Sequence, residues 1–367
     1  MLTGQNGILN RAQEAKEKTE VAQDDENEKL QGYEKIINKY GGLPKEEGTT
    51  PYLPNDTFSY KEGNLSTGLV IEDANNNEYV WVEVPKTNIV YSTAGTNITN
   101  FTDEEYTKIE TDLKTYTSDY KADGYSDTNS NFTTQYRNML KSVYTNGGFW
   151  IGRYEAGLEE GKNPRTEYTA LTASDKAVVK PNMYPYNYVT RDEAQILATR
   201  MSYAGCTSSL MFGIQWDLIL KYLEKKGVAE KTELTTDSKT IGNYYDGEFT
   251  LNRGKFAQYN ALSNWHDFNS EEIKSLVTGS KKKEQSIYEN SILLTTGAIE
   301  IANLMNIYDI AGNVVQWTLE FHDIDNPCTA RSGSYRTPGW EHPAMGHYSN
   351  VLSFANDDIG FRIGLWK

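Results

Sequence analysis

The chain has 367 residues, a formal net charge of −15 at neutral pH and a sequence pI near 4.9. Nucleic-acid binding needs a basic surface that displaces counterions from phosphate, so this charge argues against a nucleic-acid partner and equally against an anionic membrane surface. The 26 tyrosines, together with abundant Asn, Thr, Ser and Gly, are typical of extracellular binding surfaces rather than of cytosolic enzymes.

The first forty residues predict a long amphipathic helix. Ile8, Leu9, Ala12 and Ala15 recur at helical spacing, and nearly all the positions between them are charged or Gln. The stretch "YGGLPKEEGTTPYLPND" then has the composition of a linker, which we place at residues 41–64. The sequence contains no run of roughly 20 apolar residues that would predict a spanning helix. Its first residues also lack the basic region and apolar core of a signal peptide.

Residues 65–367 predict an α+β ligand-binding domain that opens with strands. "GLVIEDANNNEYVWVEVP" (68–85) alternates apolar residues on both sides of an Asn-rich turn, which indicates a hairpin. Residues 93–135 are dominated by Thr, Ser, Asp, Asn and Tyr and predict an insertion or a long surface excursion. "NGGFWIGRYEAG" (146–157) then indicates a short buried strand.

Two helices and a strand-rich end follow. In "YVTRDEAQILATRMSYAG", Thr190 and Glu193 have the spacing of a capping box, which predicts a helix start. "GIQWDLILKYLEKKG" predicts a second helix with Trp216, Leu220 and Leu223 facing inward. "NIYDIAGNVVQWTLEFH", "ARSGSYR" and "DIGFRIGLW" predict a strand-rich C-terminal third.

Few residues suggest metal or redox chemistry. Cys206 and Cys328 lie outside any CxxC or CxxH pattern. In an exported protein they would form one long-range disulfide, and otherwise both are buried thiols; the sequence leaves both possibilities open. His342 and His347 have no HExxH or Cys partner, so we interpret them as surface histidines rather than zinc ligands.

The segment "RSGSYRTPGWEHPAMGHYSN" (331–350) contains several large aromatic and apolar side chains, although its sequence predicts a loop. Buried segments show a period of 2 or 3.6, and residues 335–358 show neither. The large residues are also interleaved with Glu341 and Asp358, which resist full burial. We therefore expect an exposed binding surface in which about a third of the side chains act as internal supports. A buried core is the alternative.

The motifs "FWIGRYEAG", "VTRDEA", "GIQWDLILKYL", "NIYDIAGNVVQWT", "ARSGSY" and "DIGFRIGLW" resemble, in order and approximate spacing, those of formylglycine-generating-enzyme-like proteins. The "GNVWEW", "RGGSW" and "GFR" elements of that family correspond to residues 312–317, 331–335 and 360–362. The resemblance runs from about residue 65 to the C-terminus. It implies a C-type lectin-like fold of the formylglycine-generating-enzyme type, preceded by the long N-terminal helix.

The same resemblance bears on chemistry. The family's copper-dependent oxidases carry cysteines shortly after "RGGSW", and residues 336–342 contain none. A related branch holds iron through three histidines of a separate helical domain, whereas residues 1–40 contain no histidine. We therefore expect no enzymatic activity and no required cofactor. A divergent metal-dependent oxidase is the alternative.

The C-terminal segment is also similar to the variable proteins of diversity-generating retroelements. In those proteins a fixed frame is interrupted by freely varied positions, and here Arg331, Gly333, Gly339, Gly360 and Phe361 match that frame. The resemblance implies a variable region at about residues 331–367. The ligand-binding positions that it implies are Tyr335, Arg336, Thr337, Trp340, Glu341, His342, Met345, His347, Tyr348, Val351, Leu352, Phe354, Asn356, Asp357 and Asp358.

These resemblances imply a surface-displayed receptor or adhesin whose ligand is a varying protein or glycan on another cell or phage. "LTGQNGILNRAQEAKEKT" (2–19) resembles the segment after the hydrophobic anchor of type IV prepilin-like proteins. It implies attachment to a pilus-like assembly or the cell envelope, outside a bacterial cell. A phage tail receptor-binding protein, with the helix as a trimerisation element, is a further alternative.

The fold that this resemblance implies often binds calcium structurally. By resemblance, the ligands would be the Asp309 carboxylate and the backbone carbonyls of Gly312 and Val314, with Gln316 at the place of the family's acidic residue. The alternative is that Asp309 caps a turn.

Overall fold

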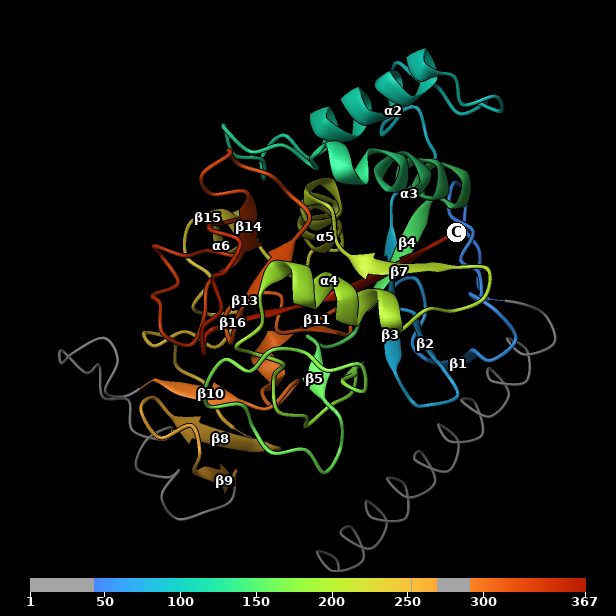
Figure 1. Ribbon diagram of the computed structural model, residues 1–367. Helices are drawn as coiled ribbons and strands as arrows, with labels where there is room; N and C mark the ends of the chain where they lie inside the picture. Colours follow the sequence, from blue (N-terminus) through green and yellow to red (C-terminus); the bar gives the residue numbers. More distant parts are fainter. Residues whose placement is uncertain (1–42, 252, 269–290) are drawn as a thin grey trace, which may run out of the picture.

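A computed structural model describes residues 43–251, 253–268 and 291–367 of the chain (Figure 1). The helix predicted for residues 1–40 lies outside these residues. The described part is a mixed α/β structure made mostly of short strands with few helices. None of the helices in this part combines the length and the apolar character needed to cross a membrane.

The largest sheet has six strands in the order β1-β2-β3-β4-β17-β7, and each neighbouring pair is antiparallel. The predicted hairpin is β2–β3, and the predicted buried strand is β4. Every residue of β4 is buried, which indicates that both faces of this part of the sheet are covered. The strands are Ser59–Glu62 (β1), Val70–Glu72 (β2), Glu78–Glu83 (β3), Gly148–Gly152 (β4), Thr207–Leu210 (β7) and Ile363–Trp366 (β17).

The helices pack around this sheet. The predicted capping box at the start of α4 is confirmed, because Thr190 Oγ1 accepts from the backbone N–H of Glu193 and the Glu193 carboxylate accepts from the Thr190 N–H. Helix α5 buries the predicted inward residues and packs against β3. The α-helices are Asp103–Tyr116 (α2), Thr133–Asn146 (α3), Arg191–Arg200 (α4), Gly213–Lys225 (α5) and Lys231–Thr235 (α6), and the short 3-10 turns are Ser130–Phe132 (η1) and Glu300–Ala302 (η2).

A second sheet carries the C-terminal segment. Its four strands follow the order β15-β14-β13-β16, in which β13 and β16 run parallel and the other pairs are antiparallel. Arg362 alone separates β16 from β17, so the chain passes there directly from this sheet into the six-stranded one (Figure 1). The strands are Val315–Thr318 (β13), Cys328–Arg331 (β14), His347–Asn350 (β15) and Ile359–Phe361 (β16).

Three small sheets complete the described structure. One has the order β10-β8-β9, and the other two are the pairs β5–β6 and β11–β12. Their strands are Gly157–Leu158 (β5), Ala177–Val178 (β6), Lys255–Gln258 (β8), Trp265–Asp267 (β9), Ile292–Leu294 (β10), Asn303–Leu304 (β11) and Ile307–Tyr308 (β12).

The linker predicted at residues 41–64 is wrong for its described part. Strand β1 belongs to the large sheet, and both Leu43 and Phe58 are buried. The indole N–H of Trp81 donates to Thr49 Oγ1 at 2.9 Å, and that of Trp150 donates to the Tyr52 carbonyl at 2.8 Å. The segment is ordered by these distant tryptophans, although its Gly and Pro content indicates loop.

The excursion predicted at residues 93–135 contains a helix. Helix α2 begins with a capping box formed by Thr102 and Glu105, and it buries Ile109 and Leu113. Two apolar residues one turn apart are enough to hold it against α3 and α5.

Both cysteines are free thiols, so the disulfide alternative is wrong. Cys328 is buried in β14, and Cys206 is half-buried just before β7. The Cys206 thiol donates instead to the Trp366 carbonyl at 3.0 Å.

Candidate binding face

The chain between β14 and β16, drawn in red in Figure 1, contains both exposed and buried residues. Trp340, Val351 and Leu352 have exposed fractions of 61%, 46% and 53%, and Glu341 is also exposed. Together with the half-buried His342 and Tyr348, these residues are called the C-terminal face from here on. They lie on the loop before β15, on β15 itself and on the turn after it.

The two half-buried members of the face hold each other. The rings of His342 and Tyr348 stack at a centroid distance of 4.5 Å, and the Tyr348 hydroxyl donates to the Glu341 carbonyl at 3.4 Å. The His342 N–H donates to the Pro338 carbonyl at 3.1 Å. Burial lowers the pKa of His342, so its imidazole is neutral at pH 7. The loop is therefore fixed on both sides of its aromatic pair.

Tyr335 and Asp357 were predicted as exposed binding residues, and that placement is wrong. Their exposed fractions are 0% and 4%. The Tyr335 hydroxyl donates to the Asp357 carboxylate, and the Arg336 guanidinium forms an ion pair with it. These donors make burial of a carboxylate tolerable. The Tyr335 ring packs in a small cluster with Ala257, Leu262, Leu293 and Val314.

Further predicted positions hold the two ends of the loop together. The Ser334 hydroxyl donates to Asp358 at 3.2 Å, and Thr337 Oγ1 accepts from the Ser334 N–H at 2.9 Å. The Asn356 carbonyl accepts the Tyr188 N–H at 2.9 Å. Thr337, Asn356 and Asp358 are half-buried, and their polar groups bind the protein itself.

Three more predicted positions pack inward. The Met345 N–H donates to the Leu234 carbonyl at 3.0 Å, and the Phe354 ring lies 6.2 Å from that of Trp317. The His347 side chain has an exposed fraction of only 3%. Phe354 and Met345 therefore connect the face to the main core, and His347 connects it to a buried charge cluster.

That cluster is centred on Arg331, which is fully buried under the loop. Its guanidinium lies 2.6 Å from Asp217 Oδ1 on α5 and 3.1 Å from Glu320 Oε2, and His347 Nε2 lies 3.3 Å from Glu320 Oε1. The motif comparison had marked Arg331 as a frame residue. The sequence analysis did not identify Asp217 or Glu320. A signal was present for Asp217, because this acid lies between Trp216 and Leu218 in the predicted helix.

The two carboxylates differ in their proton affinity. Burial is the largest influence on Asp217 and raises its pKa to about 7, in spite of the contact with Arg331. Burial acts in the same direction on Glu320, but the Arg331 charge and the His347 contact outweigh it and lower the pKa to about 2. Arg331 therefore contacts one carboxylate, Glu320, whose charged form is favoured, and a nearer one, Asp217, whose burial favours the protonated form.

The residues predicted to bind calcium do not fit that ion. Arg362 is buried among them and donates to Gln316 Oε1 and the Asp309 carbonyl, each at 3.0 Å. The Asp309 carboxylate accepts the N–H of Gly297, twelve residues earlier in the chain, at 2.7 Å. Gly312 donates its N–H to a serine hydroxyl, and Val314 is buried. A guanidinium thus contacts two of the four predicted ligand residues, and a divalent cation beside it would be repelled.

No cluster of three or more His, Cys, Asp or Glu side chains that could hold a metal ion is found in residues 43–251, 253–268 and 291–367.

Comparison with known proteins assigns no family. No family model matches the chain, and no curated protein matches it. Among solved structures, the chain is similar to "Treponema denticola variable protein 1", with a TM-score of 0.32 and 13% sequence identity. That match covers 60% of this chain and 85% of the other.

Proposed function

We propose that this protein is a non-enzymatic receptor or adhesin that binds ligands through its C-terminal face. In this proposal the scaffold is a C-type lectin-like fold of the formylglycine-generating-enzyme type. A retroelement diversifies residues 331–367, and the ligand is a protein or glycan on another cell or phage.

The exposure of Trp340, Val351 and Leu352 above a buried polar framework is the observation that supports this proposal most. Rigid aromatic side chains supply much of the energy of protein interfaces, and they lose little conformational entropy on binding. Arg331 and Asp357 are buried and paired beneath them, so the course of the loop does not rest on Trp340, Val351 or Leu352. A binding surface that must tolerate substitution needs exposed contact residues that are distinct from the buried residues holding the loop.

The proposal also places the protein outside a bacterial cell. The N-terminal segment, through its resemblance to prepilin-like proteins, would attach it to a pilus-like assembly or the envelope. The net charge of −15 is consistent with protein or glycan ligands and disfavours nucleic acid.

Sequencing the gene from many clones of a host population tests the diversification. We expect substitutions concentrated in the codons for Trp340, Glu341 and Leu352, and none in those for Arg331 and Phe361. A neighbouring reverse transcriptase gene and a near-identical template repeat should accompany them. Substitutions spread evenly along the gene, or none at all, would refute the diversification.

Two matched libraries test the binding surface. One randomises the six residues of the C-terminal face, and the other randomises six buried positions that include Arg331, Tyr335 and Asp357. Displayed on yeast, the first library should remain folded by protease resistance and yield binders to an immobilised test protein such as lysozyme. If the first library unfolds as often as the second, the face is part of the core and the proposal fails.

A further inference from the structure

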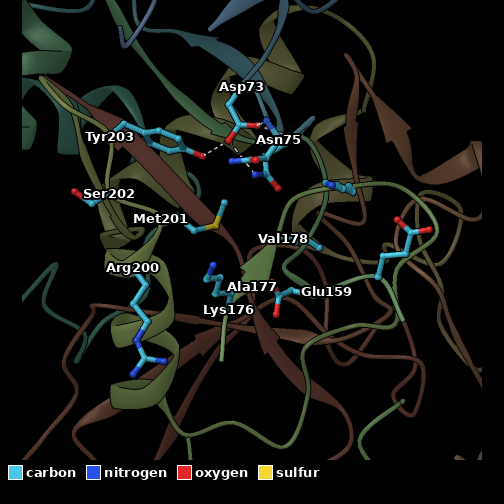
Figure 2. Close-up of a pocket in the computed structure, with 13 residues that line it drawn as sticks. Asp73, Asn75, Glu159, Lys176, Ala177, Val178, Arg200, Met201, Ser202 and Tyr203 are labelled. Atoms are coloured by element: carbon cyan, nitrogen blue, oxygen red, sulfur yellow. Dashed lines mark hydrogen bonds between the residues drawn. The ribbon is translucent and has the colours of Figure 1, made fainter. Parts of the chain in front are cut away.

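A pocket of about 450 Å³ lies between the β2–β3 turn, the β5–β6 pair and the end of α4 (Figure 2). None of its lining residues belongs to the C-terminal face. Its volume falls within the range of small-molecule binding sites in proteins. Its chemistry can therefore be considered separately from the function proposed above.

One side of the pocket is rigid. Asp73 Oδ1 accepts the N–H groups of Asn75 and Asn77, both at 2.8 Å. Its Oδ2 accepts Asn77 Nδ2 at 2.9 Å and the Tyr203 hydroxyl at 2.8 Å (Figure 2). These four bonds use the acceptor capacity of the carboxylate. Asp73 therefore orients the turn and the Tyr203 ring, and it leaves ligand recognition to other groups.

Several other groups lining the pocket are polar and unengaged, whereas the Arg200 guanidinium donates to the Thr172 and Asp175 carbonyls. The side chains of Asn75, Glu159, Glu160, Lys176 and Lys180 make no hydrogen bond or ion pair with any residue in the described part of the chain. Figure 2 shows Glu159 and Lys176 across the pocket from Asp73 and Tyr203. They are available donors and acceptors beside a fixed aromatic ring.

The charges of the pocket are balanced and interleaved. Its acids are Asp73, Glu159 and Glu160, and its bases are Lys176, Lys180 and Arg200. Asp73 and Arg200 are bonded to the protein, so the charges left for a ligand are those of Glu159, Glu160, Lys176 and Lys180. The register of β5 and β6 pairs Leu158 with Ala177, so Glu159 and Lys176 follow as the next opposed positions. Equal numbers of acids and bases leave the pocket without a net charge, which favours a neutral ligand over an anion or a cation.

The apolar part of the lining consists of Tyr203 and Met201, which can contact the face of a ring-shaped ligand. Tyr203 is held edge-on against Phe58 at a ring distance of 4.7 Å, and the Met201 side chain projects beside the pocket (Figure 2). A sugar ring presents C–H groups on its faces and hydroxyls on its rim. Such a ring can pack on Tyr203 and Met201 while its hydroxyls bond to amide, carboxylate and ammonium groups.

We propose that this pocket binds a neutral sugar of one or two rings. The aromatic and thioether side chains contact its C–H faces, and Asn75, Glu159 and Lys176 bond to its hydroxyls. This binding does not depend on the C-terminal face.

Saturation-transfer NMR on the full chain tests the proposal with methyl glycosides of glucose, mannose and galactose and with the neutral disaccharides lactose and sucrose. N-acetylneuraminic acid, glucosamine and serine serve as anionic, cationic and zwitterionic probes. We expect transfer from at least one neutral sugar at about 10 mM, about tenfold above a weak Kd of about 1 mM. Transfer confined to charged or zwitterionic probes, or none from any neutral sugar, would overturn the proposal.

A matched pair of double variants locates the site. Glu159→Ala with Lys176→Ala removes one acid and one base from the pocket, and the affinity for the neutral sugar should fall at least tenfold. Glu104→Ala with Lys108→Ala removes an exposed ion pair of α2 with the same net charge change and should leave the affinity within twofold. Trp340→Ala should also leave it unchanged. Equal binding by the pocket variant and the wild type would overturn the assignment.

Discussion

Alanine substitutions at Trp340 and Tyr335 should have very different effects on stability, although both side chains are large aromatics five residues apart. The Trp340 side chain is mostly exposed, whereas Tyr335 is fully buried. About two-fifths of Trp340 is removed from water, roughly 100 Å² and hence at most about 2.5 kcal/mol. Part of that area belongs to backbone and Cβ atoms that alanine retains, so we expect a loss of about 1 kcal/mol.

The cost at Tyr335 has two parts. Removing a buried aromatic ring typically costs about 3–5 kcal/mol through lost burial and the remaining cavity. Its hydroxyl also donates to the buried Asp357 carboxylate, and losing such a charge-assisted bond adds about 1.5–3 kcal/mol. The two variants should therefore differ by at least about 3.5 kcal/mol, or about 5 °C in Tm for a chain of this length.

Differential scanning calorimetry of the wild type, Trp340→Ala and Tyr335→Ala measures this difference. Tyr335→Phe is the control, since it keeps the ring and loses only the hydroxyl, and it should fall between the other two variants. If Trp340→Ala lowers the Tm as much as Tyr335→Ala does, Trp340 is a core residue and the reasoning behind the C-terminal face is wrong.

Three more outcomes are expected. The raised pKa of Asp217, about 7, means that its contribution to stability is full below about pH 4 and is lost as the pH rises to 7. Asp217→Asn should remove this decrease of up to about 1.4 kcal/mol per pH unit in denaturation experiments between pH 5 and 7, and an unchanged slope would contradict the assignment. Phe361→Ala should cost about 3–5 kcal/mol in calorimetry because Phe361 is fully buried in β16, and retained stability would show that this strand is not part of the frame. Because Arg362 occupies the predicted calcium position, adding calcium or EDTA should move the Tm by less than about 1 °C. A rise of several degrees with calcium would contradict that conclusion.

The parts of the fold that could be predicted rest on local signals. The Thr190 and Glu193 spacing determines the start of α4, and the alternation around residues 73–77 determines the β2–β3 hairpin. In the α4 cap and in the hairpin, the residues from which the element was predicted contact one another in the structure. The order of residues 49–52 could not be found this way, since Thr49 and Tyr52 are held by the indoles of Trp81 and Trp150 from elsewhere in the chain. Strand β1 was missed because its segment has the Gly and Pro content of a loop, although it pairs with the nearby β2.

The sequence predicted which segment carries the candidate site, but it did not predict which of its residues are exposed. The missing periodicity of residues 335–358 predicted a loop with exposed large side chains, and Trp340, Val351 and Leu352 are exposed. The prediction was wrong for much of the segment, since residues 347–350 form β15 and most of the other large side chains are buried or half-buried. Asp357 was expected at the surface because it is charged. Its burial depends on Tyr335 and Arg336, which lie more than twenty residues earlier in the chain. The pocket could not be predicted from the sequence, because three segments that are distant in the chain form it.

The central position of β17 in the six-stranded sheet has a consequence for synthesis. Residues 363–366 emerge from the ribosome after every other described element, yet they fill the space between β4 and β7. The two halves of the sheet cannot join until translation has passed Trp366. A premature stop codon anywhere upstream, of the kind that error-prone copying generates, would leave an open sheet for proteases to remove. Only messages read through to this strand would yield a finished molecule.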